Sequence, residues 1–139
     1  MEQSISITNV LTEHLPNREL AEEIINRHLV NPDEFYTEYP FPAIAKSDAG
    51  FERNKSGNSW NYYSQAITIL RWTRWMDYYG YSKEFDAVLE KWVRQWALSK
   101  TIMFGQELDP FTGEPSNCSE WYSSCMLVYI YAVRRLGIL

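Results

Sequence analysis

The sequence predicts an all-α protein, and the pattern of its apolar residues carries that prediction. Four segments have the length and spacing of helices: Asn17–Leu29, Trp60–Tyr79, Ser82–Met103 and Ser119–Leu136. The first and third have one apolar stripe, whereas the second and fourth are apolar around most of their circumference. A helix that is apolar all round is surrounded by protein, so one-sided and buried helices should alternate along the chain.

The connections between the helices follow the same alternation. Only Gly80 and Tyr81 separate the second helix from the third, whereas long loops, Val30–Ser59 and Phe104–Cys118, precede the two buried helices. Loops of this length usually carry function, and antiparallel helices would bring both loops to one end of the fold. The pattern therefore predicts part of a double ring, with buried helices inside, one-sided helices outside and the long loops at one mouth. An ordinary four-helix bundle, with short loops throughout, is the alternative.

Residues at the helix ends support these boundaries. Asn31 and Pro32 end the first helix, and Ser82 is a candidate N-cap for the third. Gly80 and Gly137 follow the second and fourth helices, at the position where a left-handed residue commonly ends a helix.

Length and composition narrow the function classes. The 139 residues fit one domain spanning positions 1–139, and the net charge is −5 without any basic cluster, which argues against nucleic-acid binding. No apolar run is long enough to cross a bilayer, so we expect no membrane partner. The opening residues lack the features of a signal peptide, and we expect a cytoplasmic location.

Metal and cofactor sites are not expected. His14 and His28 lie far apart in the sequence without an acidic cluster nearby. Cys118 and Cys125 lack the spacing of a zinc site, and whether they form a disulfide stays open.

Aromatic residues are abundant, at 16% of the chain. Trp60 and Trp121 lie at the predicted mouth ends of the two buried helices, where a ring could stack on the apolar face of a sugar or pack at the rim. Tyr39 and Phe41 could shape a pocket, although packing is the simpler role for both. Four carboxylates are less favoured site candidates: Glu38, Asp48, Glu114 and Glu120.

The two long loops and the residues just after them contain motifs that occur together in one group of enzymes. An Asn-Pro-x-Glu-Phe-aromatic-Thr-x-Tyr-Pro segment begins at Asn31, and Asn-Ser-Trp ends at Trp60. Asp-Pro-x-Thr-Gly-Glu begins at Asp109, and Trp-x-Ser begins at Trp121. In this order and spacing the motifs resemble the inverting α-glycosidases of glycoside hydrolase families 63 and 37, such as mannosylglycerate hydrolases, processing α-glucosidases and trehalases.

The resemblance implies an (α/α)6 toroid that hydrolyses α-glycosidic bonds with inversion. In such enzymes one carboxylic acid protonates the leaving oxygen while a second carboxylate activates water. The resemblance places the general base in the Phe104–Pro115 loop and the general acid, an Asp, upstream of this chain. The family toroid has many more helices than the four predicted here, so the chain corresponds to its C-terminal portion.

Two positions depart from the family pattern. Asn61 follows Trp60 where the family often has a substrate-binding Arg. Gln106 stands where the family has its catalytic Glu, with Glu107 one residue later, and an amide cannot accept a proton from water. Either Glu107 is the base, which we favour, or the chain is catalytically inactive at this position.

The leading hypothesis is thus a glycoside hydrolase-like domain with Glu107 as its base and substrate contacts from Trp60, Asn61, Tyr39, Phe41, Gln106 and Trp121. The alternative is a non-catalytic helical module that binds a carbohydrate or a protein. The two buried helices would expose apolar faces in an isolated chain, which predicts self-association or pairing with the rest of a toroid.

Overall fold

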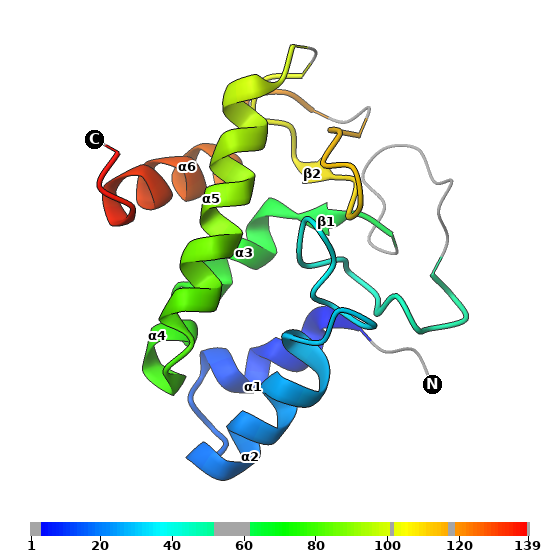
Figure 1. Cartoon of the computed structure of the whole chain (residues 1–139), viewed down its shortest axis with the longest axis vertical. Coiled ribbons are helices and arrows are strands. Elements are labelled where there is room, and N and C mark those ends of the chain that lie inside the picture. Colours follow the sequence, from blue (N-terminus) through cyan, green and yellow to red (C-terminus); the bar gives the residue numbers. More distant parts are fainter. Residues whose placement is uncertain (1–3, 52–61, 101, 117–118, 139) are drawn as a thin grey trace.

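A computed structural model describes residues 4–51, 62–100, 102–116 and 119–138 of the chain. Figure 1 shows a helical protein in which the long helix α5 crosses the molecule, with α1 and α2 at one end and a small strand pair on one side. The helices are η1 (Ile5–Ile7), α1 (Thr8–Thr12), α2 (Arg18–Ile24), η2 (Ile25–Leu29), α3 (Ala66–Trp72), α4 (Met76–Tyr79), α5 (Ser82–Leu98) and α6 (Ser123–Arg135). The strands are β1 (Ser64–Gln65) and β2 (Glu107–Leu108). The predicted all-α class is confirmed.

The first predicted helix corresponds to α2 and η2. The Asn17 side chain accepts a hydrogen bond from the Leu20 backbone N–H at 2.9 Å and so caps the first turn of α2. The helix then continues through a π-helical turn, η2, and ends at Leu29, as predicted.

The second predicted helix is shorter than expected and is broken. Its predicted first residues include Ser64 and Gln65, which instead form β1 and pair antiparallel with Leu108 and Glu107 of β2. The Thr73 hydroxyl donates a hydrogen bond to the Leu70 carbonyl at 2.8 Å, a local bond that competes with helix continuation between α3 and α4. Gly80 ends α4 with a φ of 91°, as predicted.

The third and fourth predicted helices are α5 and α6, both with corrected ends. The N-cap of α5 is Tyr81, and the Ser82 hydroxyl donates to Asp77 Oδ1 at 2.6 Å, so the predicted capping role of Ser82 is wrong. The α5 helix ends at Leu98 instead of Met103 because Ser99 is extended. The α6 helix begins at Ser123, four residues later than predicted, and Gly137 follows it with a φ of 67°.

One helical segment was not predicted. Residues Ile5–Thr12 form η1 and α1, in which the hydroxyls of Thr8 and Thr12 donate to carbonyls one turn earlier. Ser4 pairs with Ile44 as an isolated bridge, which fixes this N-terminal segment against the first long loop.

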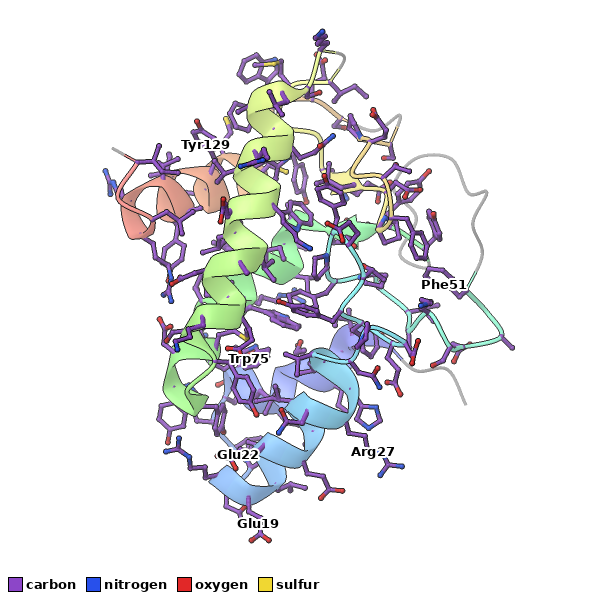
Figure 2. All side chains as sticks on the ribbon, in the orientation of Figure 1. Glu19, Glu22, Arg27, Phe51, Trp75 and Tyr129 are labelled. Carbon is purple, nitrogen blue, oxygen red and sulfur yellow. The ribbon has the colours of Figure 1, made fainter. Side chains whose placement is uncertain are left out.

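The core lies where α3, α4 and α5 meet the N-terminal helices. Figure 2 shows Trp75 in this central position, and its side chain is fully buried together with those of Trp72 and Trp92. The α6 helix is less enclosed than predicted, since Leu127 and Ile130 are 53% and 47% exposed. The two predicted inner helices, α3 and α6, pack on each other, and α6 also packs on α5.

No helix in the described part of the chain is long and apolar enough to span a membrane. Among the described residues, no three His, Cys, Asp or Glu side chains are grouped so that they could hold a metal ion. His14 Nε2 lies 2.9 Å from the Arg74 carbonyl, and His28 Nδ1 lies 2.7 Å from Glu34 Oε2. Cys125 is buried with its sulfur 2.7 Å from the Gly105 carbonyl, and Cys118 lies outside the described residues.

Candidate functional site

The two long loops meet at one end of the fold, as the helix order predicts. The Tyr39 backbone N–H donates to the Pro110 carbonyl at 2.9 Å, and the Ser64 hydroxyl donates to the Tyr39 carbonyl at 2.6 Å. Pro42 forms an isolated bridge with Ser64, next to the β1–β2 pair. We use the term mouth for residues Tyr39–Ala45, β1, β2 and residues 109–116.

Glu107 is the central carboxyl group of the mouth. Its side chain is 0% exposed. Ser116 Oγ donates to Oε1 at 2.7 Å, and Gln65 Nε2 donates to Oε2. These two donors are neutral, and β1 and the segment after β2 thus help to fix the orientation of the carboxyl group.

Gln106 lies beside this group. Its side chain is 8% exposed, and its Nε2 lies 3.5 Å from Gln65 Oε1. The Gln106 backbone carbonyl accepts from the Ala66 N–H at 3.1 Å, which joins the loop to the first turn of α3. The two positions that compete for the role of base are therefore joined through one side chain, that of Gln65.

Asp109 organises the turn that follows β2. Its Oδ2 accepts from the Tyr62 hydroxyl at 2.6 Å, and its Oδ1 accepts from the backbone N–H groups of Phe111 and Thr112 at 2.8 Å and 2.9 Å. Burial raises the pKa of Asp109, but these hydrogen bonds outweigh burial and hold the pKa below its usual range. Asp109 therefore stays ionised at neutral pH and is unsuited to donate a proton.

Tyr39 closes over this turn. Gly113 has a φ of 73°, and a Cβ atom built on it would lie 2.6 Å and 2.7 Å from the two ε carbons of the Tyr39 ring. Only glycine combines this conformation with such a close approach. The Tyr39 hydroxyl lies 3.4 Å from Gln95 Oε1, so the ring also contacts α5.

Trp121 forms a separate aromatic surface. Its side chain is 56% exposed, and its ring lies 5.7 Å from that of Phe104. Phe104 and Trp121 both have positive φ angles, and the Trp121 N–H donates to the Met103 carbonyl at 2.9 Å. The described contacts of Trp121 do not include the Glu107 group.

The other predicted site residues differ in accessibility. Phe41 is 0% exposed and stacks on Trp72 in the core, whereas Trp60 and Asn61 lie outside the described residues. Of the less favoured carboxylates, Glu38 pairs with Lys91 at 3.1 Å. Asp48 Oδ1 accepts from the Gly50 N–H at 2.7 Å, and Glu114 and Glu120 are exposed.

Three residues that build this site were not predicted from the sequence. Gln65 and Ser116 hold Glu107, and Tyr62 holds Asp109. A polar Gln65 inside the apolar run before α3 was a usable signal, because a buried polar side chain needs a partner. Nothing in the local sequence marks Ser116.

The fold resembles that of a known enzyme. No family model matches the sequence, and no curated protein matches it. Among solved structures, the chain is similar to a GH63 mannosylglycerate hydrolase from Thermus thermophilus, solved in complex with Tris. The TM-score is 0.71 at 14% sequence identity, over 87% of this chain and 27% of that chain. The chain thus has the fold of a segment of an (α/α)6 glycoside hydrolase and spans about a quarter of that protein's length.

Proposed function

We propose that residues 1–139 form one glycoside hydrolase-like domain that acts on α-glycosidic bonds with inversion, and that Glu107 is its general base. The observation that carries the proposal is the fixed, buried carboxyl group of Glu107 at the end of the fold where the long loops meet. Support comes from the loop motifs and from the fold shared with a GH63 hydrolase.

In the proposed reaction Glu107 takes a proton from a water molecule as that water attacks the anomeric carbon. Ser116 and Gln65 orient the carboxyl group, and a water that reaches Oε1 has to replace the Ser116 hydroxyl. The general acid is not among the carboxyl groups that we place at the mouth, so another part of a completed toroid supplies it. Inverting enzymes hold the two groups about 6.5–9.5 Å apart, which leaves room for the water.

The proposed substrate contacts are those predicted from the sequence. Gln106 precedes Glu107 in the chain, Tyr39 lies over the Gly113 turn of the mouth, and the exposed ring of Trp121 offers a flat surface for a sugar. Trp60 and Asn61 precede β1 in the sequence and complete the proposed set. Phe41 supports the mouth from the core. A cytoplasmic location remains part of the proposal.

A second candidate function has one observation in its favour. The Glu107 side chain is fully buried, and both of its oxygens accept hydrogen bonds within the protein. That arrangement suits a structural carboxyl group in a non-catalytic module that binds carbohydrate through its exposed aromatic rings. In this case Gln106, which stands at the family's base position, marks the loss of catalysis.

The test is a hydrolysis assay with α-mannosides and α-glucosides of an acidic phenol, a leaving group that departs without protonation and so does not need the general acid that lies outside this chain. Sugar release is measured for the wild type and for Glu107→Gln. We expect turnover to fall about 100-fold or more in the variant, the usual contribution of a general base. The matched control is Glu114→Gln, an exposed carboxylate of the same loop, which should keep wild-type turnover. Nuclear magnetic resonance of the first sugar released should show the inverted anomer.

Two outcomes would decide for the second candidate. One is saturable binding of an α-glycoside, seen as a shift in tryptophan fluorescence, without any turnover. The other is the gain of turnover in Gln106→Glu alone, which would identify position 106 as the natural place of the base. Turnover that is unaffected in Glu107→Gln would reject Glu107 as the base.

A further inference from the structure

An apolar groove lies between α3 and α6, away from the polar groups of the mouth. It has a volume of about 550 Å³ and is lined by Leu70, Leu127, Ile130, Tyr131, Arg134 and Arg135. Leu127 and Ile130 are about half exposed although they belong to a helix of mainly apolar residues. An exposed apolar surface of this kind, bordered by charged residues, marks an interaction site.

The two arginines of the groove differ in what they bind. Arg135 donates to both Asp77 and Asp86 at 2.5–2.7 Å, and to the Tyr131 hydroxyl at 3.0 Å. Arg134 is exposed and has no hydrogen-bond or ion-pair partner among the described residues. The groove therefore ends in one cation that is available to a partner with an acidic group.

An acidic residue, Glu120, precedes the opposite end of the same helix. Ser123, Leu127, Ile130 and Arg134 are spaced so that they form one exposed stripe along α6. Glu120 is exposed and lies shortly before Ser123, the first residue of this stripe, in the sequence. The stripe thus has two apolar residues in the middle and a cation near its C-terminal end, and a carboxylate precedes its N-terminal end in the chain.

We propose that a second copy of this chain occupies the groove, with the two α6 helices antiparallel about a two-fold axis. A two-fold interface pairs one surface with itself, so the surface has to be self-complementary. The α6 stripe meets this condition: Leu127 of one copy packs on Ile130 of the other, and Arg134 lies near Ser123 and Glu120 of the second copy. Antiparallel helices also place opposite macrodipole ends together.

The charges favour an antiparallel over a parallel arrangement of the two copies. Parallel helices would bring the two Arg134 side chains together, and like charges at an interface disfavour association. The proposal concerns the α3–α6 groove, and it requires that the part of a toroid which supplies the general acid to the mouth does not occupy this groove.

Sedimentation equilibrium of the purified chain tests the pairing. We expect a dimer, and we expect Leu127→Glu to weaken association at least 100-fold, because it buries a carboxylate among apolar residues of both copies. Leu20→Glu is the matched control, since Leu20 is 48% exposed on α2, far from the groove, and should leave the dimer intact. Circular dichroism of both variants separates loss of pairing from loss of folding.

A charge-reversal cycle tests the antiparallel arrangement itself. Arg134→Glu and Glu120→Arg should each weaken the dimer several-fold, and the double variant should recover most of the loss. A wild-type chain that remains monomeric at high concentration would overturn the proposal, as would a trimer or a head-to-tail ring that completes a toroid. A dimer in which the double variant is no tighter than the single variants would overturn the antiparallel pairing.

Discussion

The mouth and the far end of α6 are both held by polar clusters, but the two clusters are built differently. At the mouth, the buried carboxyl group of Glu107 accepts hydrogen bonds from two neutral side chains. At the other end, Arg135 binds Asp77 and Asp86, whose side chains are 45% and 46% exposed. We call this second group the Arg135 cluster.

The two clusters differ in whether water can replace a side chain that is removed from them. If a partner is removed from the Arg135 cluster, solvent can reach the remaining charges, and exposed ion pairs contribute little to stability. If a partner is removed at the mouth, a buried polar atom loses a hydrogen bond that solvent cannot easily replace, which costs much more. The mouth should therefore be the more sensitive of the two regions.

The largest expected effect is that of Gly113→Ala at the mouth. The new Cβ would overlap the Tyr39 ring, and alanine is also strained at a φ of 73°. We expect the free energy of unfolding to fall by about 3 kcal/mol, measured by urea denaturation, from strain and overpacking together.

Gly137→Ala is the matched control near the Arg135 cluster. Gly137 has a similar φ of 67°, but a Cβ atom there would meet nothing within 4 Å. Only the backbone strain remains, so the loss should be about 1 kcal/mol. Equal losses for the two variants would show that the Tyr39 contact contributes nothing.

The next largest effect is expected for Glu107→Ala. This substitution removes the carboxyl group that accepts from the buried Gln65 amide and from the buried Ser116 hydroxyl. We expect the free energy of unfolding to fall by about 2–3 kcal/mol, because the loss of a hydrogen bond between buried groups carries a desolvation cost. If the free energy of unfolding falls less in Glu107→Ala than in the variants Asp77→Asn and Asp86→Asn of the Arg135 cluster, water enters the mouth freely.

The order of helices and the meeting of the loops could be predicted from the sequence because they depend on local patterns. The apolar stripe of α5 and the left-handed Gly80 are properties of a few neighbouring residues, and the structure confirms both. The Asp109 turn was also predictable from its Asp-Pro and Thr-Gly pairs. Such features depend little on distant parts of the chain.

The partners of Glu107 could not be predicted, because they depend on contacts between distant segments. Gln65 lies 42 positions before Glu107, and its hydrogen bond follows from the pairing of β1 with β2. That pairing also removed Ser64 and Gln65 from the second predicted helix, since their backbone groups bond to the loop instead. Tertiary contacts here override the local helical pattern.

A smaller effect is expected from the pH dependence of the Arg135 cluster. Hydrogen bonds from Arg135, more than any other contact, hold the pKa of Asp77 below its usual range, although burial opposes this shift. Because the pKa is lower in the folded state, the ionised group stabilises the fold above about pH 4, and this contribution is lost as the pH falls through the folded pKa. We expect wild type and Asp77→Asn to differ by about 1 kcal/mol at neutral pH, a value reduced by solvent screening.

Urea unfolding of both proteins across the acidic range measures this effect. Their free energies of unfolding should converge as the pH falls through the lowered pKa of folded Asp77, because the protonated side chain resembles asparagine. A difference that persists at low pH would mean that the shape of the side chain matters and its charge does not.

The smallest effect is expected for Asp86→Asn in the same cluster. Arg135 keeps its two contacts with Asp77 in this variant, so the loss should be about 0.5 kcal/mol or less. That loss should nearly disappear in about 1 M salt, where exposed charges are screened, whereas the loss in Glu107→Ala should not change because its group is buried. Salt dependence thus separates the two clusters even where the losses in stability are similar. If the loss of stability in Asp86→Asn does not change with salt, the charges of the Arg135 cluster are shielded from solvent in the same way as the Glu107 group of the mouth.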